Sequence, residues 1–194
     1  MSGPLAQLYE EHSSLSAVLH AMSALVREVR EHDRRVDPKI FRAILYYLDV
    51  FLEREHHHKE EAVLFPRIRQ RTHDADTVLD QLAHEHESGE EAIRELEQAF
   101  VRYEEHGSTE FAAFADAVDR YVSRYREHMR KEERDVMPLA QRVLSAQDWI
   151  DIEAAFASHR DPLTGTSPDT AHDQLFRRIV MLVPAPLGLG SPLG

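Results

Sequence analysis

Hydrophobic residues recur at helical spacing along four long segments of residues 1–142. The first segment begins at Pro4, a residue suited to the first turn of a helix, and keeps an apolar residue every three or four positions to about residue 32. The stretch DRRVDPK then interrupts the pattern, and Asp37 as a capping residue followed by Pro38 predicts a new start. We expect the second helix to run from 38 to about 70, with a kink or a thinner last turn at Pro66.

Two further segments follow the same pattern. The break THDAD precedes a third helix from about residue 75, which Gly107 ends, and Ser108 can cap a fourth helix that reaches about residue 142. Long helices joined by short turns, with no strand pattern, predict an all-α fold. The expected architecture is an up-down-up-down four-helix bundle over residues 1–142.

The C-terminal region, residues 143–194, has a different character. The stretch SAQD at 145–148 resembles a capping box and predicts a short fifth helix that carries Trp149, Ile150, Ile152 and Phe156. After residue 160 the chain holds DPLTGTSPDT, the apolar stretch LFRRIVMLV and the terminal PAPLGLGSPLG. The proline and glycine content predicts an extended tail that lies on the bundle or reaches a partner subunit.

Composition narrows the classes of protein. The 194 residues carry a formal net charge of −12 without a dense basic patch, so nucleic acid is not an expected partner. We find no signal peptide and no apolar run near the about 18 residues of a membrane span, so we expect a cytoplasmic protein outside the membrane. Cysteine is absent, so any metal must be held by nitrogen and oxygen. The sequence leaves a homo-oligomer open.

The chain has 13 histidines, an unusually high number for 194 residues. The chain is expected to reverse its direction at each turn of the bundle. The number of residues between a side chain and the turn therefore predicts its position along the bundle axis. His12 lies 20 residues before the end of the first helix and His56 lies 18 residues after the start of the second. By the same count Glu60 is level with His86, and His86 is level with His128. All four helices therefore deliver a histidine to one layer.

Two helices carry the same local pattern, HHHKEEAVLFP and HMRKEERDVMP. In the first, His56 and Glu60 are four residues apart, and in the second, His128 and Glu132 are four apart, so each pair lies on one helix face. One such pair is a weak signal, because it is common as a salt bridge on exposed helices. Two copies with the same flanks favour a pseudo-symmetric site for two metal ions in the bundle core.

The remaining histidines have weaker claims. His84 lies two residues from His86 on nearly the opposite face, so the two cannot both point inward. His57 and His58 flank the core, where His57 could bind a metal or orient a ligand. The others have no partner in the layer and are predicted to be surface or packing residues: His20, His32, His73, His106, His159 and His172.

These stretches resemble a known family. YEEH, HHHKEEAVLFP, HEHESGEE and EHMRKEERDVMP are similar to the motifs of the hemerythrin-like HHE cation-binding domain, over about residues 5–142. DWIDIEAAF, DPL and PAPLGLG resemble the C-terminal extension of a bacterial branch of that family. The resemblance implies a centre of two non-haem iron ions, capped by histidines and bridged by carboxylates. By position its ligands would be His12, His56, Glu60, His86, His128 and Glu132.

The sequence departs from the oxygen carriers of that family in one respect. Those proteins use five histidines, two of them on the third helix, whereas the third helix here offers only His86 on the expected face. Glu90, one turn beyond, and His57 are the candidates for a seventh ligand. The difference argues against reversible oxygen carriage. Zinc or manganese would also suit a set of imidazole and carboxylate ligands.

The sequence therefore predicts a metal-binding protein that senses, binds or responds to oxygen, nitric oxide, peroxide or iron status. The first alternative is an oxidase or peroxidase-like enzyme with two irons, which would need a substrate channel. The second is a helical interaction protein with a single zinc or no metal. The fold alone does not choose among these functions.

Overall fold

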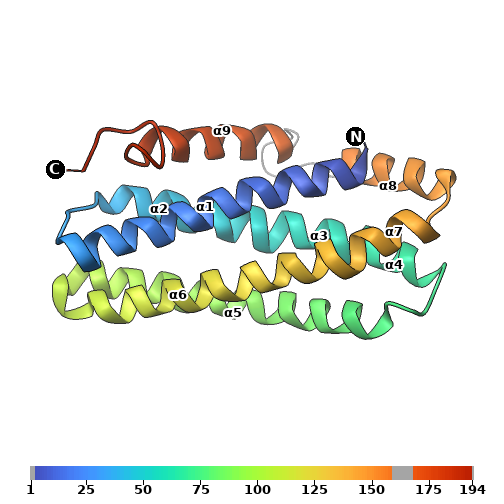
Figure 1. The fold of residues 1–194 in the computed structure, drawn as a ribbon, viewed down its shortest axis with the longest axis horizontal. Helices are drawn as coiled ribbons and strands as arrows, with labels where there is room; N and C mark the ends of the chain where they lie inside the picture. The colour runs from blue at the N-terminus through green and yellow to red at the C-terminus, as the bar shows by residue number, and fades with distance from the viewer. Residues whose placement is uncertain (1–2, 159–167, 194) are drawn as a thin grey trace.

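The computed structural model describes residues 3–158 and 168–193. These residues are mostly helical and form no β-strand, which confirms the all-α class. The longest helices are α1 (Pro4–His32), α5 (Asp76–His106) and α6 (Ser108–Lys131). Figure 1 shows them side by side with the second long segment, and the chain reverses its direction at each connecting turn.

The second long segment changes its helical type several times between residues 38 and 69. It consists of α2 (Pro38–Tyr47), the π-helical η1 (Leu48–His56), α3 (His57–Lys59), the π-helical η2 (Glu60–Leu64) and α4 (Phe65–Arg69). Its start agrees with the sequence, because the Asp37 side chain accepts a hydrogen bond of 2.9 Å from the Lys39 backbone N–H. The fourth segment continues from α6 through the π-helical η3 (Glu132–Val136) into α7 (Met137–Val143).

The two copies of the repeated motif share an unusual backbone feature. The Phe65 N–H donates to the Glu60 carbonyl, five residues earlier, and the Met137 N–H donates to the Glu132 carbonyl in the same way. A proline follows each donor, and a proline ring clashes with the carbonyl four residues before it in an α-helix. A single wider turn relieves that clash and is a common feature of functional sites. The sequence predicted a disturbance at Pro66, and the structure shows it as a π-turn.

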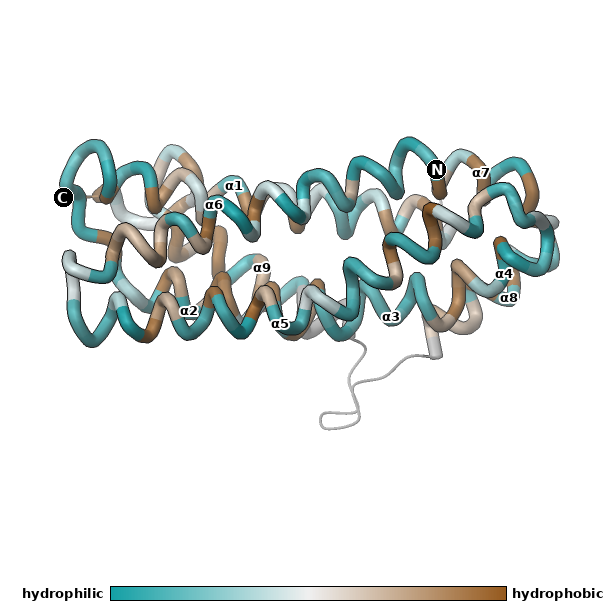
Figure 2. Tube along the Cα trace, turned by 90° about the horizontal axis from the view of Figure 1, so that it is seen from below, coloured by the Kyte–Doolittle hydropathy of each residue, from teal (hydrophilic) through white to brown (hydrophobic). Residues whose placement is uncertain are grey.

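The hydrophobic core is divided into two clusters. Figure 2 shows hydrophobic and hydrophilic positions alternating along the helices. The larger cluster joins the second half of α1 to α2, η1, α6, the second half of α5 and α9 (Pro168–Leu182). The smaller cluster joins the start of α1 to η2, α4, the start of α5, α7 and α8 (Ala146–Ser158). His12, His56 and His86 lie along the chain between residues of these two clusters, and His128 directly precedes Met129 of the larger cluster.

The helix α8 begins as the sequence predicted. The Asp148 carboxylate accepts a hydrogen bond of 2.8 Å from the Ser145 backbone N–H, and the Ser145 hydroxyl accepts one of 3.2 Å from the Asp148 N–H. This reciprocal pair is a capping box. Arg71 also donates two hydrogen bonds of 2.9 Å to the same carboxylate, which ties the start of α8 to the end of α4.

The predicted extended tail is wrong over residues 168–182, which form the helix α9. The apolar stretch places Leu175, Ile179 and Val183 four residues apart, and Ile179 and Val183 are buried against the bundle. Phe176 of α9 lies 6.2 Å from the ring of Tyr47 on α2. After α9, prolines and glycines resume at Pro184, and residues 183–193 are not helical. Residues 161–167 of the DPLTGTSPDT stretch lie outside the described part of the chain.

Candidate metal centre

The structure brings the six predicted ligands and His57 into one buried layer. Four α-helices and three π-helical segments supply them: α1, α3, α5 and α6 with η1, η2 and η3. None of these side chains exposes more than 5 % of its surface. Buried imidazoles and carboxylates are costly unless a partner compensates them. The residues involved are His12, His56, His57, Glu60, His86, His128 and Glu132.

The layer contains two overlapping groups whose ligand atoms converge. One group is His12, His56, Glu60 and Glu132, and the other is Glu60, His86, His128 and Glu132; within each, the ligand atoms lie within 4.8 Å of one another. The Nε2 atoms of the two histidines lie 3.1 Å apart in the first group and 3.0 Å apart in the second. Both glutamates belong to both groups.

Glu60 faces the two groups with different oxygens. Its Oε1 lies 3.9 Å from His56 Nε2, and its Oε2 lies 3.6 Å from His86 Nε2. The Oε2 atom is buried and has no hydrogen-bond partner among the described residues. A carboxylate placed in this way can bridge two cations.

Glu132 repeats the arrangement from the opposite helix. Its Oε2 lies 3.3 Å from His12 Nε2, and its Oε1 lies 3.1 Å from His128 Nε2. Both oxygens are at ion-pair distance but lack hydrogen-bond geometry in the described part of the chain. The carboxylate oxygens and the histidine Nε2 atoms thus converge within the layer, as the ligands of a cation would.

Each of the four histidines is oriented by a carboxylate on a neighbouring helix. An ionised carboxylate can only accept a hydrogen bond, so a neutral imidazole carries its proton on Nδ1 and keeps the Nε2 lone pair for the centre. The Nδ1-to-carboxylate distances are 2.9 Å for His12–Glu133, 2.7 Å for His56–Glu11, 2.7 Å for His86–Glu61 and 2.9 Å for His128–Glu85.

Two lysines complete a pseudo-twofold pattern. Lys59 donates to Glu11 at 2.5 Å, and Lys131 donates to Glu85. In both copies of the Lys-Glu-Glu motif, the lysine holds the carboxylate that orients the motif's own histidine. The first glutamate enters the centre, and the second orients the histidine of another helix. The repeat was visible in the sequence, but these roles were not.

The orienting glutamates of the other two helices were missed by sequence reasoning. Glu11 directly precedes His12, and Glu85 directly precedes His86. The only available signal was this repeated Glu-His pair on the first and third helices.

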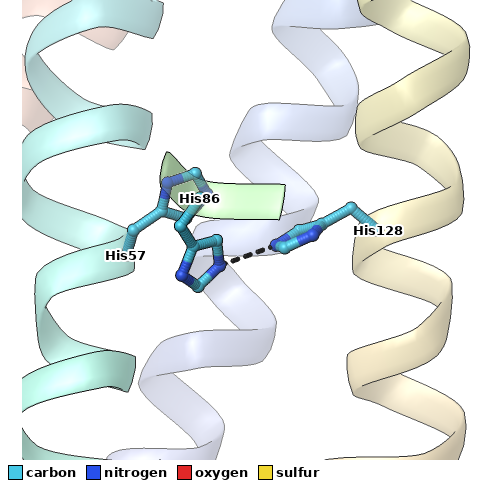
Figure 3. Close-up of side chains that lie close together, drawn as sticks. All are labelled: His57, His86 and His128. Carbon is cyan, nitrogen blue, oxygen red and sulfur yellow. Dashed lines mark hydrogen bonds between the residues drawn. The ribbon is translucent and has the colours of Figure 1, made fainter. Parts of the chain in front are cut away.

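His57 breaks the symmetry of the layer. It forms a further group of converging nitrogens with His86 and His128, and Figure 3 shows the three rings meeting from three helices. Its ring stacks on that of His86 with centroids 3.9 Å apart, and neither of its nitrogens has a hydrogen-bond partner among the described residues. The corresponding position of the other motif copy is Met129, which cannot take the same role.

A polar cluster lies behind His57. The Oε1 atom of Glu53 accepts hydrogen bonds from Tyr121 at 2.9 Å and Tyr125 at 2.5 Å. The other oxygen, Oε2, lies 3.4 Å from His57 Nδ1 and is otherwise unpartnered in the described structure. A Cβ at Gly89 would overlap both Glu53 and Tyr125, so glycine is what lets this cluster lie against α5.

Burial and charge set the protonation of the layer in the metal-free protein. Burial and the neighbouring Glu132 raise the pKa of Glu60 well above its usual range, which favours its protonated form. Burial also opposes ionisation of Glu132, but His128 and His12 outweigh it and hold its pKa well below the usual range. Burial lowers the pKa of His128, yet Glu132 and Glu85 raise it overall to about 9.

The other histidines fall where the sequence placed them, as far as they are described. His20 and His58 are exposed, and His32, His73, His84 and His106 expose 54 %, 87 %, 81 % and 60 % of their side chains. His159 and the side chain of His172 lie outside the described part. The prediction that Glu90 could be the seventh ligand is wrong, because its side chain is 69 % exposed and pairs with Arg94 at 3.8 Å.

A helical bundle with a buried layer of histidines and carboxylates is the architecture of a cation-binding domain. The family model of the hemerythrin HHE cation-binding domain matches residues 3–140, and the chain belongs to this family. A comparison of the chain with curated proteins and with solved structures found no match. None of the helices described has the length and apolar character needed to cross a membrane.

Proposed function

We propose that the layer binds two cations, with iron the natural choice. One ion would be held by His12 and His56, the other by His86 and His128, and Glu60 and Glu132 would bridge them. The orientation of the two carboxylates carries this proposal. In each glutamate, one side-chain oxygen faces a histidine of the first pair and the other oxygen faces a histidine of the second pair. The unpartnered oxygens of the layer support it, because a buried carboxylate oxygen needs a proton donor or a cation.

His57 would be the seventh ligand, on the ion held by His86 and His128. That ion would then have three imidazoles and two carboxylates, and its neighbour two of each. The layer thus offers five histidines after all, the fifth from α3 rather than from α5. The ion with four protein ligands has room for an external ligand, so a small molecule would bind beside His12 and His56.

The ligand types favour iron over softer metals. Imidazole and carboxylate ligands suit iron, manganese and zinc. The chain has no cysteine, so it has no thiolate that would favour a softer metal. An iron pair supplies reversible electron transfer and affinity for oxygen, nitric oxide and peroxide. Carboxylates on neighbouring helices would orient the ligating histidines, and the apolar clusters on both sides of the layer would exclude water.

Binding or sensing fits the site better than turnover of an organic substrate. The ligand side chains are at most 5 % exposed, so only a very small molecule reaches them without rearrangement. We therefore propose a protein that responds to oxygen, nitric oxide, peroxide or iron status.

An anaerobic titration of iron-loaded protein with nitric oxide tests this function. We expect a saturable change in the visible spectrum at about one equivalent per chain, because only one ion has an open position. No spectral change would contradict the proposal. Sustained breakdown of added peroxide by the same protein, at many equivalents per iron, would favour the enzyme alternative instead.

A further inference from the structure

A pocket outside the metal layer has the chemistry of a site for an organic cation. It lies between α1, the α2–η1 junction and α9, and has a volume of about 290 Å³. Its lining combines carboxylates with aromatic rings: Glu10, Glu11 and Asp173 with Tyr47, Phe51 and Phe176, beside Gln7 and Ser14. We propose that this pocket binds a small aliphatic ammonium ion, such as a diamine.

The carboxylates give the pocket a negative potential that the rest of the molecule reinforces. The chain as a whole carries a net charge of −12. Glu10 and Asp173 are exposed carboxylates, whereas Glu11 is buried and already paired with Lys59 at 2.5 Å and His56 at 2.7 Å. A cation is therefore the class of ligand that this pocket attracts.

The aromatic rings make the pocket more than an acidic patch. The ring of Tyr47 lies 5.1 Å from that of Phe51 and 6.2 Å from that of Phe176. The faces of such rings attract ammonium groups and also cover an alkyl chain. Tyr47 is only 1 % exposed and lines the pocket with its ring. Burial and the charges of Glu11 and Asp173 raise the pKa of its phenol, so the hydroxyl stays protonated at neutral pH.

A bare metal ion fits the pocket less well than an organic cation. Within the described part of the chain, Glu10, Glu11 and Asp173 form no group of ligand atoms within 4.8 Å of one another, as the metal layer does. The carboxylates are spread around an aromatic lining, so they suit an organic cation whose ammonium groups are separated by an alkyl chain.

The pocket also adjoins the metal layer through Glu11. This carboxylate lines the pocket, accepts from Lys59, and orients His56 at 2.7 Å. If the proposed function holds, an ammonium ion that competes with Lys59 for Glu11 would change the affinity of the nearby metal ion. Binding of the cation itself does not depend on the metal.

The test is a calorimetric titration of the metal-free full chain with 1,4-diaminobutane and, separately, with tetramethylammonium. We expect saturable binding of one molecule per chain. Phe176→Leu keeps the charge but removes a ring, and should weaken binding about three- to thirtyfold. Glu10→Gln and Asp173→Asn should each weaken it by at least about threefold. The control Glu87→Gln removes an equal charge at a residue that is 79 % exposed on α5, and should leave binding unchanged.

Several results would overturn the proposal. Absence of saturable binding of both ammonium ions would do so. An equal effect of Glu87→Gln, without an effect of Phe176→Leu, would show only diffuse charge attraction. Because the protein is metal-free, these outcomes are independent of whether the layer binds iron.

Discussion

Glu60 of η2 and Glu132 of η3 belong to both groups of converging ligand atoms. They are the fifth residues of two motif copies that begin at His56 and His128, and each sits at the start of a π-turn. The backbone widening places the two carboxylates in the centre of the layer, while the next residue of each motif turns to orient another histidine. A single repeated segment thus builds both halves of the proposed centre.

Removal of a central ligand should abolish metal binding. His56→Ala and Glu132→Ala each delete a donor that no neighbour can replace, so we expect loss of bound metal and of the stabilisation that metal adds to the folded state. Metal analysis and thermal melting of the metal-supplied proteins measure both effects. His106→Ala is the control, because this side chain is 60 % exposed and distant from the layer in sequence. Unchanged metal content in both ligand variants would show that the site is wrong.

The seventh ligand can be tested separately. His57→Ala should weaken the binding of one ion and leave the other in place, so metal content per chain should fall by about half under limiting metal. Glu90→Gln should have no effect, because Glu90 is 69 % exposed. The reverse pattern would exclude His57 as a ligand.

The orienting carboxylates should affect affinity more than stoichiometry. Glu11→Gln and Glu85→Gln replace a charged acceptor of a histidine N–H, and loss of such a partner costs about 10- to 100-fold in metal affinity. The pseudo-twofold relation predicts that the two substitutions act on different ions. A competition titration with a metal chelator measures this, with Glu87→Gln as the matched control. An effect of Glu87→Gln as large as theirs would mean that general charge, not orientation, is responsible.

The stability of the metal-free protein should fall between about pH 6.5 and 9. The pKa of His128 is raised to about 9 in the folded protein, so its contribution is complete below its unfolded pKa of about 6.5 and is lost as pH rises through 9. The loss is on the order of 3 kcal/mol. The pKa of Glu85 is lowered to about 2, chiefly by the hydrogen bond from His128, so its contribution is lost only as pH falls from about 4.5 towards 2.

Urea unfolding of the metal-free protein at pH 6 and pH 9 measures this loss. Since a metal ion must displace the His128 proton, metal affinity should rise over the same interval. The variant His106→Ala should keep the full dependence on pH. Equal stability of the metal-free protein at both values would contradict the protonation assigned to the layer.

Gly89 should be intolerant of alanine despite its place inside a helix. Glycine to alanine in a helix interior normally stabilises by up to about 1 kcal/mol. Here the added Cβ would overlap Glu53 and Tyr125, so we expect Gly89→Ala to lower the melting temperature. Tyr125→Phe in the Gly89→Ala protein removes one of the overlapping atoms and should restore part of the loss. Stabilisation by Gly89→Ala alone would show that the Glu53 cluster is not packed as described.

The helical fold and the layer could be predicted because both depend on counting residues. Apolar spacing fixes where a helix runs, and the turns at 33–37 and Gly107 reset the height, so His12, His56, His86 and His128 could be placed level. What the count cannot give is the rotation of each helix about its own axis. That rotation decides that Glu11 and Glu85 face histidines of other helices and that Glu90 faces solvent.

Two other features were beyond the sequence for different reasons. The π-turns shift the phase of the helix, so a count of 3.6 residues per turn could not place His57 inside the layer. The helix α9 was hidden by the prolines and glycines on both sides of a short apolar stretch, and it is stabilised by burial against α2 rather than by its own propensity.

The central claim is that the layer holds two ions. Metal analysis of protein expressed with iron supplied, paired with an optical spectrum in air, tests it most directly. The account predicts about two irons per chain and charge-transfer absorption that the metal-free protein lacks. A single zinc, or no metal, would contradict the two-ion centre and would favour a helical interaction protein.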